Sequence, residues 1–437
     1  MCSIAGATKK EEVEGMLHLM RHRAPDDEGI VENGLFLGMG RLAIIDLKSK
    51  GLCPIQYQNL TLVFNGELYN YLEIRDELEK LGEKFDTQSD SEVLLRAYKI
   101  WGTKCLDKFN WMGAFAISNG ETIFLARDIA GEKPLYFTRR PFEFASEKKC
   151  FRTREGVEEF PPAHYGLYSL STNRLTLERY WWHPKSIRKI SLSEAVNELD
   201  ILLADSIRLR TQSDVPYGLF YSGGIDSTLI STYHNFGNLF TYQDGNYQDE
   251  FRQVFPKILW HLDEPVRTFS PFGLWKLNEQ AKENKTKVVL SGEGADELFG
   301  GYIRFVSNEF NRKAQEHFPS YKSLFPYRDM MREEFDGNMR ELLRMGDRMS
   351  GAWGIENRCP FLDKRIIEFA FSLPIELKID GFNTKVILRE LLKKRNPTYK
   401  FEEKHGLFCS VNKWIGAGEG FDKEDYLKYQ KEICKKF

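Results

Sequence analysis

Short apolar runs recur through the stretch 34–128, and Gly, Asn or Asp bounds each of them. The runs cover residues 35–39, 42–45, 60–64, 113–117 and 122–126. Apolar runs of this length between turn residues are typical of β-strands. Two other stretches, 71–81 and 91–101, carry apolar residues at helical spacing and are predicted to be helices. Strands stacked in layers with helices outside form an α+β domain, which is what we expect of this half.

A different pattern begins near residue 190. The stretch 192–209 has a long helical period, and Ser191 or Ser193 can cap its N-terminus. A buried-strand run at 215–221 then leads through a glycine-rich turn into an apolar helix start. A length of 437 residues suits two hydrophobic cores. We therefore predict two domains, 1–185 and 190–437, which meet just before the long helix.

Composition narrows the function classes. Lys and Arg total 62 against 64 Asp and Glu, which gives a net charge of −2 and argues against nucleic acid as a partner. The seven cysteines are scattered and form no CxxC motif, so neither a disulfide framework nor a zinc site is expected. No stretch resembles a membrane span or a secretory signal, and we expect a cytoplasmic protein without a membrane partner.

Cys2 follows the first methionine directly. If Met1 is removed, Cys2 carries both a thiol, with an ordinary pKa near ~8.5, and an α-amine, with a pKa near ~7.7–8.0. The amine can then take the thiol proton at neutral pH, and the thiolate can open an amide through a thioester. For this residue alone, the alternative is a small side chain that starts a buried strand.

Polar clusters in the first half supply what such a reaction needs. They are 21–26, Arg41, 65–70 and 89–92. The Asn65 side-chain amide and the Gly66 N–H can form an oxyanion hole. Arg41 and Asp90 can bind the carboxylate and the ammonium of a free amino acid. Taken singly, each cluster also has a structural interpretation, for example as an Asn-Gly turn or as a helix cap.

The first glycine-rich turn of the second half is a candidate anion site. Residues 222–227 follow a strand and precede a helix, where backbone N–H groups and the helix N-terminus favour phosphate. An ordinary glycine turn is the alternative, but the serines and the acid around the glycines favour a nucleotide. The residues expected to contact ATP or pyrophosphate are Ser222, Gly223, Gly224, Asp226, Ser227, Ser291 and Gly292.

The second turn, 291–302, follows a strand run at 287–290 and adds acids beside its glycines. Mg²⁺ prefers carboxylate and phosphate oxygens, so Asp226 and Asp296, if brought together, could hold this ion on a nucleotide triphosphate. Neither turn has the GxxxxGK[ST] pattern of P-loop kinases and ATPases. The pattern therefore favours attack at the α-phosphate, with pyrophosphate leaving, over transfer of the γ-phosphate.

The first half resembles the class II glutamine amidotransferases. The resemblance runs from Cys2 to about Lys149 and rests on segments 21–26, 40–42, 65–70, 89–90 and 126–136. It implies an α+β N-terminal-nucleophile fold with αββα layers, in which glutamine is hydrolysed. It also implies Cys2 as the nucleophile and Asn65 and Gly66 as the oxyanion hole. The glutamine ligands that it implies are Arg41, Asn65, Glu67 and Asp90.

The second half resembles the synthetase domain of glutamine-dependent asparagine synthetases, an α/β domain of the adenine nucleotide alpha-hydrolase type. The matching segments are 222–227, 261–265, 291–297, 352–363, 385–389 and 404–406. The resemblance implies that a carboxylate attacks ATP to give an acyl-adenylate, from which ammonia then displaces AMP. It further implies Lys404 as the lysine that stabilises charge at the α-phosphate, and Glu293 as the acid near the acceptor and the incoming ammonia.

The resemblance in both halves implies a glutamine-hydrolysing asparagine synthetase that uses glutamine, ATP, Mg²⁺ and aspartate, with a homodimer as one possible assembly. The chain is shorter than the family pattern between Phe240 and His261, and it ends soon after Trp414. Two alternatives stay open. One is an amidotransferase that acts on a different carboxylate acceptor, and the other is a glutaminase whose second half only binds nucleotide.

Overall fold

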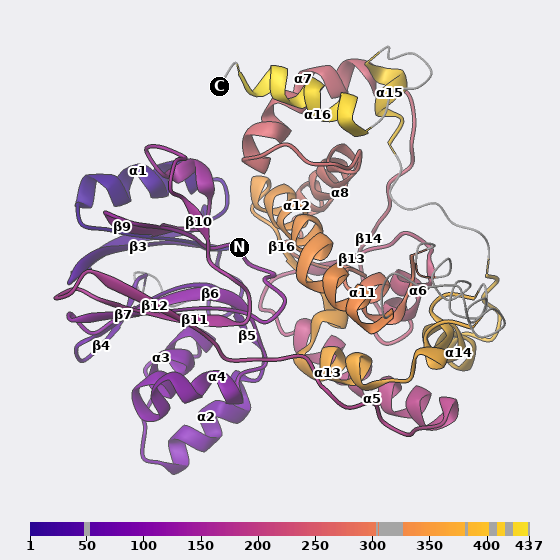
Figure 1. Ribbon diagram of the computed structural model, residues 1–437, viewed down its shortest axis with the longest axis horizontal. Helices are drawn as coiled ribbons and strands as arrows, with labels where there is room; N and C mark the ends of the chain where they lie inside the picture. The colour runs from indigo at the N-terminus through magenta and orange to yellow at the C-terminus, as the bar shows by residue number, and fades with distance from the viewer. Residues whose placement is uncertain are drawn as a thin grey trace, which may run out of the picture.

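The computed structural model consists of two lobes that lie side by side (Figure 1). The structure describes residues 1–47, 53–302, 305, 327–380, 383–401, 409–415 and 423–435. The first lobe holds the strands and helices up to residue 179, and the second begins with the helix at residue 192. The predicted domain boundary, between 185 and 190, lies in the segment that joins them.

Two antiparallel sheets of six strands face each other in the first lobe. The first sheet contains, in spatial order, β10 (Glu158–Glu159), β8 (Tyr136–Arg139), β9 (Phe142–Ala145), β1 (Ser3–Ala7), β3 (Leu35–Arg41) and β2 (Asp27–Asn33). The second contains β12 (Arg174–Arg179), β11 (His164–Ser169), β7 (Thr122–Arg127), β6 (Trp111–Ser118), β5 (Leu60–Leu68) and β4 (Ile55–Tyr57). Helix α1 (Lys10–Met20) covers the first sheet, and α2 (Tyr71–Lys80), α3 (Asp90–Trp101) and α4 (Cys105–Lys108) cover the second (Figure 1).

Side-chain alternation along β5 explains this layering, because successive residues of a strand point to opposite faces. Leu62 and Phe64 belong to the core cluster formed with Val93 of α3. Val63, between them, belongs to the cluster formed with Leu37 of the other sheet. The second sheet is therefore apolar on both faces and needs a helix on one side and a sheet on the other. The expected αββα arrangement is confirmed.

The second lobe is built around a parallel sheet with the strand order β14 (Leu239–Phe240), β13 (Tyr217–Phe220), β15 (Val288–Leu290) and β16 (Glu356–Arg358). Its helices near the sheet are α5 (Leu192–Arg210), α6 (Ile225–Ser231), α8 (Pro271–Glu283), α9 (Ala295–Phe299), α12 (Met339–Ala352), α13 (Lys364–Ser372) and α14 (Val386–Arg395). The others are α7 (Gln248–Leu262), α11 (Tyr327–Glu333), α15 (Val411–Trp414) and α16 (Lys423–Cys434). The carboxyl ends of parallel strands are the usual place for a ligand site.

Shorter helical turns complete both lobes. They are η1 (Gly102–Lys104), η2 (Lys148–Cys150), the π-helical turn η3 (Glu334–Asn338), η4 (Pro360–Leu362) and η5 (Ile375–Leu377). Over the described ranges, no helix combines the length and the apolar character needed to cross a bilayer.

The predicted helices agree with the structure, but one predicted strand does not. Helix α5 begins where expected, and Ser191 caps it in a reciprocal capping box with Glu194. The run at 42–45 is not a strand, because β3 ends at Arg41. Its apolar side chains Leu42 and Ile44 are buried in a cluster that extends into the second lobe. The run was apolar because it is covered by the other lobe and not because it lies in a sheet.

Candidate active sites

Cys2 lies immediately before β1 and is half-buried. Met1, in front of it, is completely buried. Burial lowers the pKa of the Met1 amine to about 5 and raises the pKa of the Cys2 thiol. The Arg23 Nε atom donates a hydrogen bond of 3.3 Å to the Cys2 carbonyl oxygen and holds the start of the chain in place. In the uncleaved chain the amine belongs to Met1, so Cys2 gains its own base only when Met1 is removed.

Asn65 and Gly66 lie on β5, which pairs with β6. Asn65 is completely buried, yet neither its amide nitrogen nor its amide oxygen has a hydrogen-bond partner among the described residues. A Cβ atom on Gly66 would lie 2.1 Å from the Met112 carbonyl oxygen, so only glycine fits there. Unsatisfied buried amides are rare and costly, and one here fits a site that receives a polar ligand.

Arg41 and Asp90, the predicted partners of an amino-acid head group, stand at element ends. Arg41 is the last residue of β3, and its Nη2 donates to the carbonyl oxygens of Ile45, at 3.0 Å, and Asp46, at 2.8 Å. Asp90 begins α3 and accepts a 2.9 Å hydrogen bond from the Leu68 N–H at the end of β5. Burial raises the pKa of Asp90, so a bound ammonium group would favour its charged form.

Glu67, the remaining predicted glutamine ligand, pairs with the second lobe. Its Oε1 lies 2.9 Å from Nη2 of Arg358, which is completely buried and also lies 2.8 Å from the Glu356 carboxylate. Burial raises the pKa of Glu67 although Arg358 opposes this. Sequence reasoning missed Arg358, and the only signal was its place in the family-like segment 352–363.

The candidate nucleotide turn, residues 222–227, lies between β13 and α6, as predicted. The Ser222 N–H donates a hydrogen bond of 3.1 Å to the Ser227 hydroxyl. The Ser227 and Ser222 hydroxyl oxygens lie 3.0 Å apart. Gly223 has a φ of +72°, which favours glycine, and its carbonyl oxygen accepts a 2.9 Å bond from the Tyr399 hydroxyl. Gly224 is the N-cap of α6. These residues form one closed turn at the carboxyl end of the strand.

The structure brings the predicted metal ligands together around a lysine. The Lys385 Nζ lies 2.7 Å from an oxygen of Asp226 and 2.7 Å from an oxygen of Asp296. The close approach depends on Gly292, where a Cβ atom would lie 2.9 Å from the Asp226 Cβ atom. Lys385 is buried at a φ of +53°, and its two carboxylates raise its pKa against the effect of burial. Sequence reasoning assigned no role to this lysine.

Asp226 and Asp296 already surround the ammonium group of Lys385. They fit Mg²⁺ only if other ligands complete its coordination shell. No group of three His, Cys, Asp or Glu side chains suited to a metal occurs in the described ranges. Triphosphate oxygens would supply the missing ligands, since Asp226 lies within the turn 222–227, the candidate phosphate site. The donor set therefore fits an ion that arrives with the nucleotide.

Glu293 lies in the turn after β15, beside Ser291. Burial raises the pKa of Glu293, and one of its oxygens lies 4.0 Å from the thiol sulfur of Cys359. The same sulfur lies 3.7 Å from the Ser291 hydroxyl. Lys404, the other predicted catalytic residue of this half, lies outside the described residues.

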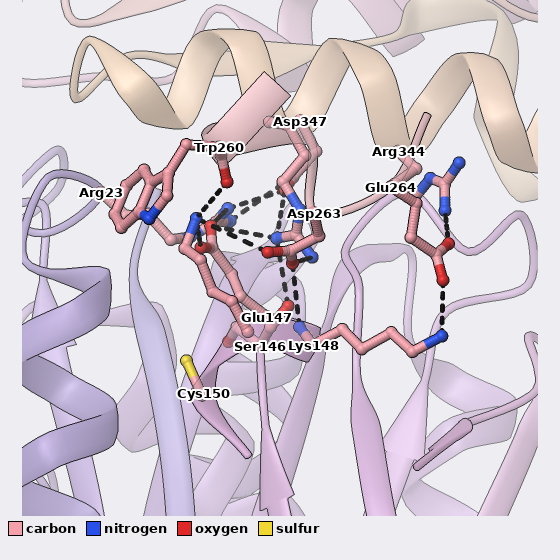
Figure 2. Close-up of polar contacts among 12 residues, drawn as sticks. Arg23, Ser146, Glu147, Lys148, Cys150, Trp260, Asp263, Glu264, Arg344 and Asp347 are labelled. Carbon is pink, nitrogen blue, oxygen red and sulfur yellow. Dashed lines mark hydrogen bonds and ion pairs between the residues drawn. The ribbon is translucent and has the colours of Figure 1, made fainter. Parts of the chain in front are cut away.

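A buried ion-pair network fixes the two lobes to each other (Figure 2). Arg23 lies 2.9 Å from Glu147 of its own lobe and 2.8 Å from Asp347 of α12. Arg348 of α12 lies 3.0 Å from Glu147 and 3.1 Å from Asp263. The side chains are at most 1% exposed. Because Arg23 also contacts the Cys2 carbonyl, the network links Cys2 directly to the second lobe.

Comparisons with known proteins cover both halves of the chain. Residues 1–176 match the model of the glutamine amidotransferase domain, and residues 198–235, 247–337 and 325–423 match that of asparagine synthase. Asparagine synthetase B [glutamine-hydrolyzing] of Escherichia coli is 32% identical over 89% of this chain and 78% of that protein. A probable asparagine synthetase [glutamine-hydrolyzing] of Schizosaccharomyces pombe is 30% identical over 99% of this chain and 87% of its own length. Asparagine synthetase [glutamine-hydrolyzing] 1 of Bacillus subtilis is 27% identical over 94% of this chain and 87% of that protein.

Proposed function

This chain belongs to the glutamine-hydrolysing asparagine synthetases, and we propose that it transfers ammonia from glutamine at Cys2 to aspartate activated by ATP. One observation carries the proposal. Glu67 of the candidate glutamine site pairs at 2.9 Å with Arg358, the last residue of β16. Strand β16 lies beside β15, which ends at the Ser291 turn. The two candidate sites thus share one buried boundary, as a reaction with a diffusible intermediate requires.

The first step uses the groups around Cys2. With Met1 removed, the Cys2 amine takes the thiol proton, and the thiolate attacks the carboxamide carbon of glutamine. The Asn65 amide and the Gly66 N–H stabilise the oxyanion. Ammonia leaves with the returned proton, and water hydrolyses the thioester to glutamate. Arg41 binds the α-carboxylate of glutamine, and Asp90 and Glu67 bind its ammonium.

The second step uses the turns after β13 and β15. Backbone N–H and hydroxyl groups of 222–227, with Ser291 and Gly292, bind the phosphates of ATP. A carboxylate oxygen of aspartate attacks the α-phosphorus, and pyrophosphate leaves. Asp226 and Asp296 would hold Mg²⁺, which would neutralise phosphate charge when bound. Ammonia then attacks the acyl carbon, Glu293 accepts a proton from the new amide nitrogen, and AMP leaves. Lys404 stabilises charge at the α-phosphate.

The test is a single incubation of the Met1-free protein with glutamine, ATP, Mg²⁺ and aspartate. We expect glutamate, AMP, pyrophosphate and asparagine in equal amounts. Glutamate without AMP would contradict a ligase and leave a glutaminase. AMP that forms only with another carboxylic acid would contradict aspartate as the acceptor. Omitting Mg²⁺ should stop AMP formation while glutamate still appears.

We also propose a cytoplasmic setting and a homodimer. All seven cysteines are free, which suits a reducing compartment. Light scattering on the purified protein measures the assembly directly, and a single-chain mass of 51.0 kDa would contradict the dimer.

A further inference from the structure

Glu132 is a buried carboxyl group for which the proposed mechanism has no use. It lies in the turn after β7, where its backbone N–H donates a hydrogen bond of 2.9 Å to the Asp128 carboxylate. Its side chain is 5% exposed, and its Oε2 has no hydrogen-bond partner in the part of the chain that the structure describes. A buried carboxylate with an unpaired oxygen is costly, whereas a neutral carboxyl costs much less.

The surroundings of Glu132 favour the neutral form. Burial and the nearby Asp128 raise the pKa of Glu132 to about 8, although the cations and a thiol contact lower it. The ionisable groups that face it come from four segments and are Tyr69, Asp128, Lys133, Arg210 and Cys359. At neutral pH most of these carboxyl groups carry their proton. Glu132 is then both a hydrogen-bond donor and an acceptor.

The turn that carries Glu132 reaches toward both candidate sites. Cys359, which contacts it, has its sulfur 4.0 Å from Glu293 of the second site. On the side of the first site, the neighbouring Lys133 affects the pKa of the Met1 amine. The Lys133 Nζ donates a hydrogen bond of 3.2 Å to the carbonyl oxygen of Asn357, which is two residues before Cys359. The turn that carries Glu132 therefore contacts the surroundings of both reaction centres.

We propose that Glu132, in its neutral form, is a positioning residue for ammonia on its way from Cys2 to Glu293. The inference rests on the proposed transfer of ammonia between the two sites. Its neutral carboxyl donates a hydrogen bond to the ammonia nitrogen, and its carbonyl oxygen accepts one back. An ionised carboxylate would instead favour ammonium. Ammonium has no electron pair with which to attack an acyl-adenylate, so ionisation of Glu132 interrupts the transfer.

The decisive measurement is the ratio of asparagine to glutamate formed from glutamine, followed from pH 6.5 to 9.5. Near pH 9 roughly a tenth of Glu132 stays neutral. We therefore expect the ratio of the unmodified enzyme to fall several-fold between pH 7 and pH 9. The Glu132→Gln variant cannot ionise and should keep a level ratio. Glu121→Gln, an exposed change in the same lobe, should follow the unmodified enzyme.

A second variant separates positioning from packing. Glu132→Ala should lower the ratio at least threefold at every pH, while glutamate release and AMP formation from added ammonia continue and report two intact sites. The inference is overturned if Glu132→Gln follows the pH profile of the unmodified enzyme, or if Glu132→Ala keeps the full ratio. An unmodified enzyme that makes no asparagine, even from added ammonia, would overturn the proposed function instead.

Discussion

At the residue scale, the candidate glutamine site is marked by one buried side chain that the folded chain leaves unsatisfied and by one carboxyl group whose pKa is raised. Asn65 is buried with both polar side-chain atoms unpaired in the described structure, and Asp90 has a raised pKa because of burial. Each unsatisfied buried polar atom costs about 1–3 kcal/mol. A bound glutamine would remove part of this cost. The free protein therefore carries a desolvation cost here, which we expect glutamine binding to reduce.

Replacement of Asn65 by Ala should lower the glutaminase kcat by about 10²–10³-fold, because one oxyanion donor is lost. Thermal unfolding should show little loss of stability, since no hydrogen bond is broken. Asn278→Ala is the matched control. The Asn278 side-chain amide donates a hydrogen bond of 2.8 Å to the Leu274 carbonyl oxygen within α8. Its loss should lower the stability of the protein without affecting glutaminase turnover. A large fall in the unfolding temperature with Asn65→Ala would mean a structural role.

Replacement of Cys2 by Ala should abolish glutamate release from glutamine but leave AMP and asparagine formation from added ammonia. The reason is that the second site needs only the nitrogen, not its source. Both activities are measured in one assay with either nitrogen donor. Cys434→Ala, a half-buried thiol at the end of α16, is the control and should keep both. Loss of the ammonia-driven reaction with Cys2→Ala would assign Cys2 to structure.

At the scale of elements, β16 joins the two halves although it has only three residues. Its residues Glu356, Asn357 and Arg358 are all buried, and each makes or accepts a charged contact. Arg358 additionally donates to the carbonyl oxygen of Gln212, at 2.8 Å, after α5. A short edge strand thus fixes a helix end, the parallel sheet and the candidate glutamine site together.

We expect Arg358→Met to destabilise the protein by about 3–5 kcal/mol, because Glu67 and Glu356 would stay buried without their cation. The KM for glutamine should rise, since Glu67 loses the group that orients it. Urea unfolding and glutaminase kinetics measure the two effects. In the exposed Arg139–Glu158 pair, Arg139→Met should cost less than about 1 kcal/mol and leave KM unchanged. An unchanged KM with Arg358→Met would separate Arg358 from the glutamine site.

Local patterns predicted the layers, the long helix α5 and the position of both glycine turns, because each depends on residues close together in the chain. The strand at 42–45 was wrong, since an apolar run does not reveal which surface covers it. Arg358, Lys385 and Glu132 were missed for a related reason. Their partners come from distant segments, so their roles follow only from the contacts of the folded chain.

At the scale of the whole molecule, the network of Figure 2 decides whether the lobes act as one body. Two further ion pairs extend the network. Lys148 of the first lobe and Arg344 of the second lobe both pair with Glu264. Removing one member leaves the opposite charge buried and unpaired, which is far costlier than losing an exposed pair. We therefore expect the coupling of the two reactions to depend on these interface residues as well as on the residues of the candidate sites.

The ion-pair network should make the association of the two lobes sensitive to acid. Burial opposes ionisation, but Lys149 and Arg348 hold the pKa of Glu147 well below its usual range, and Arg23 lowers the pKa of Asp347. Carboxyls with a lowered pKa stabilise the protein fully above their unfolded pKa, near ~4, and this contribution is lost as the pH falls below it. Urea unfolding between pH 7 and pH 3 should show this loss.

The Glu147→Gln variant tests that assignment. It should be about 3–5 kcal/mol less stable at pH 7, because Arg23 and Arg348 lose their shared carboxylate. Its stability should also fall less steeply below pH 4. Glu198→Gln removes the exposed pair with Arg188 and should change neither quantity by more than about 1 kcal/mol. An acid dependence that Glu147→Gln leaves unaltered would contradict the role of the network.

The burial of Met1 sets an order of events in the life of the enzyme. Its sulfur lies 3.5 Å from the Arg23 guanidinium, and its methyl group faces Gly351 of α12. Helix α12 is synthesised long after residue 1, and once it has docked, no peptidase can reach the first peptide bond. If Met1 is removed, we expect the cleavage that frees the Cys2 amine to precede this docking, when the first peptide bond is still accessible. We expect a chain that keeps Met1 to use free ammonia but not glutamine.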